Sequence, residues 1–367
     1  MRLVLLILFV LPIMTSAQDL SRLDFMFYNV ENLFDAVHDK GKDDWSFLPN
    51  SLKEKKEQCK KIKNDYYQNE CLKTDWTGQK LEIKLSNIRD VITSKKDSLP
   101  DFLGLCEIEN ESVVKMLADK IGYKKIIVAN GPDERGVDVA LIYRDHEKIK
   151  YISHQEHELK GKSFKGKPTR TILEVNFMIN GIYPLSLLIN HWPSQANPSE
   201  SRIMAAKKVM EIVNQKTKKN GQQAMIVMGD FNTIPTDYPH PFNEVLLKDK
   251  ILVDLHLEYM DAKKISREEK SSMPNGTYFY YKDMAWNLLD RFFVTQNLLK
   301  NKKFKINLKS YQIYTPDFIK DEFVYDRAGY NKGTKILGVP KSYNFEADQA
   351  KEAGYSDHFP ITFGLDL

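Results

Sequence analysis

The sequence is poor in cysteine, with three cysteines among 367 residues. So few cysteines exclude a small scaffold held together by disulfides. Cys59 and Cys71 lie in one polar segment and can form a disulfide in an oxidising compartment, but the sequence leaves their pairing open. Cys106 lies in an apolar run, and we expect it to be a buried free thiol.

The sequence also lacks a strong excess of either charge. Its formal net charge is +4, with 28% charged and 42% hydrophobic residues, which is an ordinary globular composition. So mild an excess does not by itself indicate nucleic-acid binding. Several lysines are nevertheless clustered, and they form either a solvated helix face or a surface that attracts phosphate polyanions. The clustered lysines are Lys53, Lys55, Lys56, Lys60, Lys61 and Lys63.

Long hydrophobic runs are absent after the first residues of the chain. Residues 1–17 contain a positive charge at Arg2, an apolar stretch to Met14 and a small-residue cleavage site that ends at Ala17. This pattern is typical of a secretory signal peptide and is too short for a comfortable membrane span. We therefore expect a mature chain from about Gln18, without a membrane span, that is secreted or periplasmic.

Residues 18–367 contain no linker rich in Ser, Gly or Pro and no internal repeat, so we expect a single domain. Strand and helix patterns alternate in places, yet several strands follow one another directly. This order favours an α/β fold with mixed sheets over a purely parallel sheet. The expected strands are 23–30, 101–108, 124–130, 137–144, 169–179, 183–192, 223–232, 276–281, 287–294 and 358–365.

Apolar residues at helical spacing predict helices around 85–92, after Asn110 and from Ser199 onward. Asn110 is the expected N-cap of the second helix. Residues 36–80 are predicted to be a long loop with some helix, and residues 300–350 a polar connection. Whether these two insertions shape a substrate site stays open.

Polar side chains stand at or just after the ends of many of these strands. Each one alone has a structural explanation, because Asp and Asn are common turn residues. In the stretch MGDFNTIP, strand alternation would place Asp230 and Asn232 on one side and turn Phe231 into the core. Glu107 is harder to assign to a turn, because a carboxylate within an apolar strand is seldom buried without a partner. The positions are Asn29, Glu31, Glu107, Asn190, His191, Asp230, Asn232, Asp290, Asp357 and His358.

If these strand ends meet, several carboxylates lie close together, namely Glu107, Asp230, Asp290 and Asp357. They would repel one another unless a cation or an imidazolium balanced their charge. Oxygen ligands without cysteine suit a hard cation, so we expect Mg²⁺, with Mn²⁺ or Ca²⁺ as alternatives. This set of residues indicates metal-assisted phosphoester hydrolysis.

Six motifs occur along the chain: YNVEN (28–32), LCEIEN (105–110), NHWPS (190–194), GDFN (229–232), LDRFFV (289–294) and YSDHFPI (355–361). Together they resemble the endonuclease/exonuclease/phosphatase superfamily, which contains deoxyribonuclease-like, metal-dependent phosphoesterases. They come in family order and span nearly the whole expected mature chain. The resemblance implies a four-layer sandwich of two packed mixed β-sheets flanked by helices, with the active site where strand ends meet.

The resemblance assigns metal binding to Glu107, Asp357 and Asn29. It also places the amide of Asn29 near the scissile phosphate. A phosphodiester is anionic, so a metal ion and a histidine are needed to offset charge on its non-bridging oxygens.

The catalytic residues that the resemblance implies are His358, Asp230, Asn232, Asp290 and His191. Asp290 would hold the imidazole of His358 and stabilise its charged form. Asp230 and Asn232 would activate or orient the attacking water and contact the phosphate. His191 matches the second histidine of deoxyribonuclease-like members. Whether Asp230 or His358 takes the proton of the water stays open.

Two further residues are weaker candidates for binding the substrate phosphate. Arg170 matches a place where related enzymes often have a phosphate-contacting arginine, and a surface strand charge is the alternative. Asp138 lies on a strand that should run into the site, and it is either a partner of His191 or a turn carboxylate.

The resemblance does not fix the substrate. An exported, mildly basic member with two histidines fits a nuclease that hydrolyses DNA or RNA by in-line attack of water, most simply an endonuclease. The alternatives are a phospholipase C or sphingomyelinase-like enzyme, a small-molecule phosphatase and a catalytically inactive binding module. The aromatic run 278–281 is predicted to be a core strand rather than an exposed hairpin for membranes. Nucleic acid is therefore the expected partner, and no stable protein partner is evident.

Overall fold

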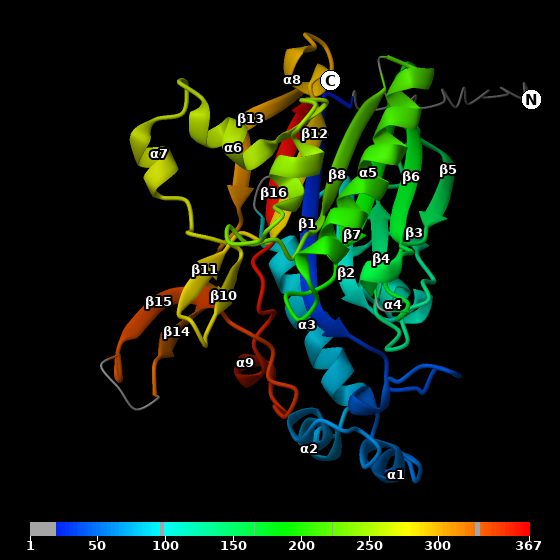
Figure 1. The fold of residues 1–367 in the computed structure, drawn as a ribbon, viewed down its shortest axis with the longest axis vertical. Coiled ribbons are helices and arrows are strands. Elements are labelled where there is room, and N and C mark those ends of the chain that lie inside the picture. The colour runs from blue at the N-terminus through cyan, green and yellow to red at the C-terminus, as the bar shows by residue number, and fades with distance from the viewer. Residues whose placement is uncertain (1–19, 96–98, 165, 222, 327–330) are drawn as a thin grey trace, which may run out of the picture.

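The computed structural model describes residues 20–95, 99–164, 166–221, 223–326 and 331–367. The expected signal peptide, residues 1–17, lies outside the described residues. Two six-stranded sheets pack face to face, and helices lie on their outer sides (Figure 1). The predicted α/β sandwich of two packed mixed sheets is thus confirmed.

The first sheet consists, in order, of β13 (Lys305–Ile313), β16 (Ile361–Asp366), β1 (Arg22–Leu33), β2 (Phe102–Ile108), β4 (Asp138–Tyr143) and β3 (Lys125–Val128). Its first and last strands in sequence, β1 and β16, lie side by side and antiparallel. β1 and β2 run parallel, and the other pairs are antiparallel. The sheet is therefore mixed.

The second sheet consists, in order, of β5 (Ile149–His157), β6 (Ile172–Ile179), β7 (Tyr183–His191), β8 (Ala224–Asp230), β12 (Asp290–Thr295) and β9 (Leu252–Asp254). β7 and β8 run parallel, and the other pairs are antiparallel. Each sheet thus has one parallel pair, whose carboxyl ends lie next to each other.

Strand alternation divides the side chains of β8 between two hydrophobic layers. Met228 packs in the layer shared with the first sheet, whereas Val227 packs in the layer on the outer side. The sheets approach closely at Gly104 of β2, where a Cβ atom would lie 2.7 Å from the sulfur of Met228. Glycine at this position therefore permits the observed packing of the two sheets.

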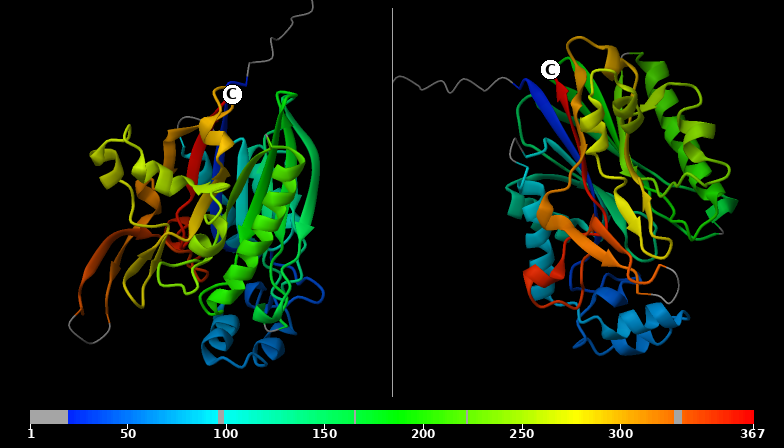
Figure 2. Two further views of the ribbon diagram at one scale, coloured as in Figure 1. Left: turned by 45° about the horizontal axis from the view of Figure 1, so that its top comes forward. Right: turned by 90° about the vertical axis from the view of Figure 1, so that its left-hand side faces the viewer.

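Amphipathic helices cover the outer faces of the sheets (Figure 2). α3 (Gly78–Thr93) and α4 (Glu111–Ile121) pack with the first sheet, and α5 (Ser199–Lys219) packs on the second. The N-cap of α4 is Asn110, whose side chain accepts a hydrogen bond from the N–H of Val113 at 3.1 Å. The three predicted helices are thus confirmed. Among the described residues, no helix combines the length and apolar character needed to cross a membrane.

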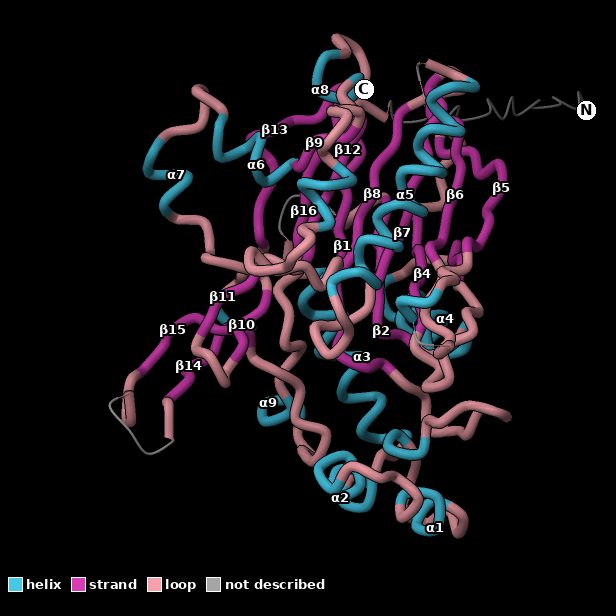
Figure 3. Tube along the Cα trace, viewed as in Figure 1, coloured by secondary structure: helices cyan, strands magenta, loops and turns pink. Residues whose placement is uncertain are grey.

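Two β-hairpins extend to one side of the sandwich (Figures 1 and 3). One is formed by β10 (Tyr278–Tyr280) and β11 (Ala285–Asn287), the other by β14 (Lys320–Val324) and β15 (Lys335–Pro340). The prediction of a core strand at 278–281 is wrong, because β10 belongs to its own two-stranded sheet. The remaining short helices are α6 (Leu255–Asp261), α7 (Arg267–Ser271), α8 (Asn297–Lys300) and α9 (Ala350–Ala353).

The prediction that residues 300–350 form only a polar connection is also wrong. This region contains β13 and the β14–β15 hairpin. β13 is an edge strand, and its side chains alternate between buried and more exposed positions, so lysines and glutamine interrupt its apolar pattern. The unpredicted β5 is likewise an edge strand with mostly exposed side chains. Edge strands carry a weaker sequence signal because much of their surface faces water.

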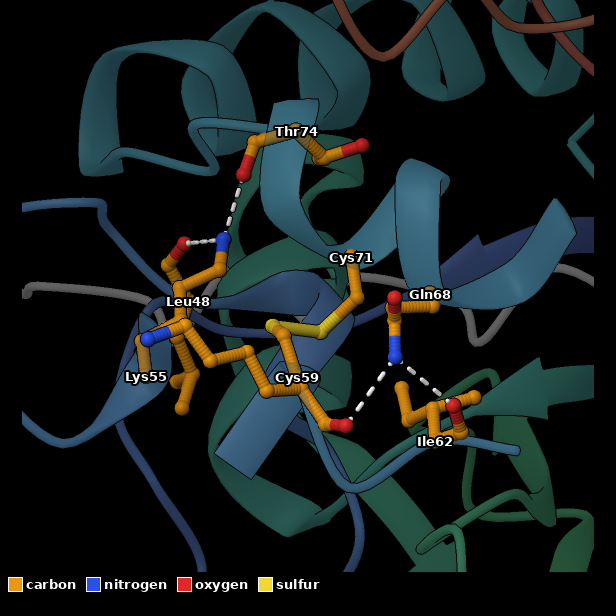
Figure 4. The surroundings of a disulfide bond; sticks show 8 residues. Leu48, Lys55, Cys59, Ile62, Gln68, Cys71 and Thr74 are labelled. Carbon is orange, nitrogen blue, oxygen red and sulfur yellow. Dashed lines mark hydrogen bonds between the residues drawn. A yellow bond between two sulfur atoms is a disulfide. The ribbon is translucent and has the colours of Figure 1, made fainter. Parts of the chain in front are cut away.

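The insertion after β1 contains α1 (Lys55–Cys59) and α2 (Asp65–Lys73), which a Cys59–Cys71 disulfide joins (Figure 4). Lys55 does not belong to a solvated lysine face. Its buried ammonium donates to the carbonyls of Leu48, at 2.6 Å, and Thr74. Cys106 is a buried free thiol, as predicted.

Candidate active site

The predicted polar positions meet where the carboxyl ends of the two parallel strand pairs reach the same edge of the sandwich. In the first sheet, Asn29 of β1 lies opposite Cys106, the residue before Glu107. In the second sheet, Asp230 of β8 lies opposite His191 on one side and Asp290 on the other. The sheet register thus places these chemically active side chains in one cluster.

Asn29 joins the two halves of this cluster. Its Nδ2 donates hydrogen bonds to Oε1 of Glu107 and to Oδ2 of Asp230, both at 3.1 Å. Its Oδ1 accepts the N–H of Glu31 at 3.0 Å. Asn29 therefore bridges a carboxylate of each sheet, and its expected role as a metal ligand stays a prediction.

His358 has acidic groups around both ring nitrogens. Its Nδ1 lies 2.7 Å from Oδ2 of Asp290, and its Nε2 lies 3.9 Å from Asp230 and 4.0 Å from Asp357. Burial opposes a positive charge here, yet the carboxylates of Asp290, Asp357 and Asp230 raise the pKa of His358 well above its ordinary value. His358 is therefore an imidazolium at neutral pH.

His191 is equally buried but has a different neighbour. Nη2 of Arg170 donates to Nε2 of His191 at 2.9 Å, and since a guanidinium has no acceptor, this nitrogen must accept. Burial, together with the positive charges of Arg170 and Arg135, lowers the pKa of His191 well below its ordinary value. The ring is therefore neutral, although Nε2 lies 3.7 Å from Oε1 of Glu107.

Asp230 and Asn232 are held by a turn rather than by strand alternation. β8 ends at Asp230, and Asn232 has a φ of 47°, in the left-handed region. The N–H of Asn232 donates to Oδ1 of Asp230 at 2.9 Å, and its Nδ2 donates to the carbonyl of Trp192 at 3.1 Å. The prediction that strand alternation continues over 230–232 is thus wrong, because a turn positions Asn232. Phe231 is nevertheless buried in the core as predicted.

Gly229 has a steric role in the same motif. A Cβ atom there would lie 2.4 Å from the carbonyl oxygen of Asn190, on the neighbouring β7. The side chain of Asn190 bonds to the carbonyls of Leu188 and Met228, at 3.0 and 3.3 Å. Asn190 therefore fastens the two parallel strands together and does not face the carboxylates.

Strained backbone surrounds the cluster. Glu31, Asn32, Glu107 and Asn232 all have positive φ values, between 47° and 60°. Such conformations cost on the order of 1–3 kcal/mol for a residue other than glycine and concentrate at functional sites. The N–H of Asn32 donates to Oε2 of Glu107 at 3.1 Å, so this strain serves to hold a carboxylate.

The cluster has the donor atoms that a divalent cation requires. Oxygens of Glu107 and Asp230 and a nitrogen of His191 lie within 4.8 Å of one another. The nitrogen that faces the carboxylates already accepts from Arg170, so the carboxylate oxygens are the available metal ligands. Oδ1 of Asp357 is buried and has no hydrogen-bond partner among the described residues. Burial raises the pKa of Asp357 to about 6, and the nearby Glu107 adds to this effect. A hard cation would satisfy the orphaned oxygen and offset this repulsion.

Glu31 is part of the site, although the sequence only placed it among the polar strand-end positions and assigned no role to it. Its Oε2 accepts the N–H groups of Asp357 and Tyr343, at 2.8 and 2.7 Å. It thereby fixes the backbone that carries Asp357 and His358. Its position in the YNVEN motif could have indicated this role, because it follows Asn29 at the strand end.

Tyr278 is a second residue that the sequence did not reveal. Its ring centroid lies 4.9 Å from that of His358, and the two residues form an isolated β-bridge. The β10–β11 hairpin therefore borders the catalytic cluster. No sequence signal identifies this contact, because it depends on how the hairpin folds back.

The two weaker candidates have different environments. Arg170 is buried, so a surface strand charge is excluded, and its guanidinium also binds Asp133 at 3.3 Å. Oδ1 of Asp138 accepts the N–H of Gly131 at 2.9 Å. No hydrogen bond joins Asp138 to His191 within the described part of the chain. Asp138 is instead the first residue of β4, and its carboxylate holds the backbone of the preceding loop.

Two packed mixed sheets with carboxylates and imidazoles at one edge define the phosphoesterase fold of the endonuclease/exonuclease/phosphatase superfamily. A family model described as Endonuclease/Exonuclease/phosphatase family matches residues 55–366. The chain therefore belongs to this family. No curated protein sequence matches the chain.

Solved structures agree on the fold. An endonuclease/exonuclease/phosphatase family protein from Bacteroides thetaiotaomicron is 16% identical with a TM-score of 0.52, covering 95% of this chain and 99% of that one. A mannosyl-6-phosphatase from the same organism is 15% identical with a TM-score of 0.53, covering 94% and 100%. D. rerio TDP2 complexed with a single-strand DNA product is 14% identical with a TM-score of 0.50, covering 95% and 100%. At these identities the likeness shows the fold alone.

Proposed function

We propose that the protein is an exported phosphodiesterase that depends on a divalent metal ion, most simply an endonuclease acting on DNA or RNA. The observation that carries this proposal is the geometry around His358. Its Nδ1 is bound to Asp290, while its Nε2 faces Asp230 and Asp357. A cationic donor thus stands beside a carboxylate base and beside oxygens that can hold a cation, as hydrolysis of an anionic ester requires.

Asp230 is the proposed base. Burial raises its pKa to about 7, and the neighbouring Asp290 adds to this rise. Such a carboxylate can accept a proton from water near neutral pH. Asn29 and the N–H of Asn232 hold its two oxygens in place. The water would attack phosphorus in line with the leaving oxygen, with inversion and without a covalent enzyme intermediate.

His358 would donate a hydrogen bond from Nε2 to the phosphate and offset the charge that develops there. Asp290 keeps the ring oriented and charged. Glu107 and Asp357 would hold the divalent cation, with Mg²⁺ as the proposed ion and Mn²⁺ or Ca²⁺ as alternatives, and the bound cation would stabilise negative charge on the leaving oxygen. His191 is neutral and accepts a hydrogen bond from Arg170. It would therefore contact the substrate without adding positive charge beside the cation.

Two observations support the export and the substrate. The Cys59–Cys71 disulfide is typical of proteins that fold in an oxidising compartment, which agrees with the expected signal peptide. The structure of D. rerio TDP2 with a single-strand DNA product shows that this fold can accommodate a nucleic acid. We therefore favour nucleic acid as the substrate.

Supercoiled plasmid incubated with purified protein tests this proposal. We expect nicking with Mg²⁺ and none with EDTA. Asp230→Asn and His358→Ala should each reduce the rate by about 10²–10⁴-fold, the usual contribution of a general acid or base. His154→Ala, at an exposed position on the edge strand β5, is the matched control and should retain full activity. Near-wild-type nicking by either site variant would refute the assignment.

A small-molecule phosphatase is the second candidate, because a mannosyl-6-phosphatase shares the fold. Phosphate release from mannose 6-phosphate without plasmid nicking would favour this function. The catalytic residues would be the same in both functions. In either assay, an activity that is lost in Asp230→Asn and His358→Ala identifies an enzyme, whereas a binding module has no activity to lose.

A further inference from the structure

Lys84 is an unusual residue just behind the carboxylate cluster. It lies on α3 and is fully buried. Its Nζ has no hydrogen-bond partner among the described residues. A buried ammonium that lacks hydrogen bonds is costly and rarely tolerated without a compensating charge. Lys80, one turn earlier, shows the ordinary solution, because its Nζ donates to the carbonyls of Phe345 and Glu346, both at 3.2 Å.

Aromatic rings hold the Lys84 ammonium in place. Nζ lies 3.8 Å from the ring centroid of Tyr343 and 4.8 Å from that of Phe345, both within the range of cation–π attraction. The backbone N–H of Tyr343 in turn donates to Glu31, which also accepts the N–H of Asp357. The ammonium is thus fixed next to the segment that positions the metal-side carboxylates.

The charge of Lys84 acts on those carboxylates. Burial lowers the pKa of Lys84 to about 8, while Glu31, Asp357 and Glu107 oppose this shift. The N–H of Tyr343, whose ring lies under the ammonium, donates to Glu31, so the lysine and this carboxylate are held by the same residue. Lys84 and the cluster therefore stabilise each other electrostatically without touching through a hydrogen bond.

We propose that Lys84 is a built-in counter-cation of the Glu31, Glu107 and Asp357 carboxylates and that its fixed charge limits how tightly this cluster binds a divalent cation. It is a positioning residue, since it acts through the carboxylates and not on the substrate. The inference rests on the proposed metal dependence. The charge of Lys84 would keep the carboxylates ordered when no metal is bound. It would also let a bound metal ion exchange, because the ion is held less tightly.

Calorimetric titration of the full-length protein with Mn²⁺ at pH 7, where Lys84 is mostly charged, tests this inference. Lys84→Met keeps a side chain of similar length that packs on the same rings. It should bind Mn²⁺ about tenfold more tightly, because a buried positive charge beside the carboxylates repels a cation bound to them. Lys84→Arg keeps the charge and should retain the wild-type affinity. Lys80→Met removes a buried lysine from the same helix, so it should lower stability but leave the affinity unchanged.

Thermal denaturation gives an independent readout. The rise in Tm caused by a fixed Mn²⁺ concentration should be larger in Lys84→Met than in the wild type, because tighter binding stabilises the folded state more. An equal or weaker Mn²⁺ affinity in Lys84→Met would overturn the role of Lys84 alone. A wild type that binds no Mn²⁺, with Glu107→Gln behaving identically, would overturn the proposed metal dependence as well.

Discussion

The two histidines of the site provide a natural comparison, because both are 5% exposed and the Nε2 atom of each lies 3.9 Å from Oδ2 of Asp230. His358 has Asp290 at one ring nitrogen, whereas His191 has Arg170. Burial disfavours the charged form of both rings. The partner decides the outcome, so that one imidazole is charged and the other neutral within the same cluster. An active site can thus obtain two functions from one residue type by changing a single neighbour.

Replacing the partner of His358 should have the largest effect. In Asp290→Asn, the pKa of His358 should fall because its main stabilising carboxylate is lost. The ring then loses its proton at lower pH, so the alkaline limb of the kcat/KM profile should move to lower pH, with about a 10²-fold loss at neutral pH.

Asp254→Asn is a suitable control for that variant. Asp254 is buried at the junction of β9 and α6, and it binds Arg291 at 2.6 Å. This change should reduce stability but leave the pH profile in place. An unshifted alkaline limb in Asp290→Asn would show that the partner does not set the charge of His358.

Replacing the partner of His191 should have a smaller effect. In Arg170→Met, the pKa of His191 should rise, because a positive neighbour is lost while Glu107 and Asp230 remain near Nε2. We expect about a tenfold loss of activity, in line with the loss of one charge-assisted hydrogen bond. NMR titration of the ring nitrogens measures the pKa directly.

Arg144→Met serves as the matched arginine control, since Arg144 pairs with Asp101 at 3.1 Å outside the cluster. The His191 titration should be unchanged in that variant. A ring that stays neutral at pH 6 in Arg170→Met would mean that Arg170 does not decide the charge of His191, and the comparison with His358 would then fail.

The smallest effect on activity is expected from the disulfide. The Cys59→Ser, Cys71→Ser double variant opens a loop with a sequence separation of 12 residues. Such a crosslink contributes about 2–4 kcal/mol to stability. The Tm should therefore fall by several degrees, while kcat/KM stays within about twofold, because no hydrogen bond joins either cysteine to the catalytic residues in the described structure.

Dithiothreitol should lower the Tm of the wild type and not that of the double variant. A large loss of kcat/KM in the folded double variant would show that the insertion belongs to the site.

Much of the candidate site could be predicted because strand ends are local features. Glu107, Asp230 and Asp290 each stand at the boundary of an apolar run, and sheet geometry brings such boundaries to one edge. The resemblance to a family added the pairing of Asp290 with His358, and the hydrogen bond between them agrees with it.

The rest of the molecule depends on contacts between distant segments. Lys84 is one lysine among many in the sequence, and only the packing of α3 against Tyr343 distinguishes it. Tyr278 borders His358 because a hairpin folds back. The edge strands β5 and β13 were missed because a strand with one solvated face has few apolar residues. Asn232 required a left-handed turn, which the Asp-Phe-Asn pattern did not distinguish from a continued strand.

The hydrogen bonds of Asn29 to both sheets have a consequence for the activity of the chain before it folds. Glu107 comes from one sheet and Asp230 from the other, and Asn29 binds both only when the sheets are docked. Neither sheet alone contains a complete catalytic centre. If the chain is exported as we propose, it is unfolded inside the cell that makes it and has no complete catalytic centre there. It would then be unable to cleave the nucleic acids of that cell before it folds outside. The docking of the two sheets would then determine when the enzyme becomes active.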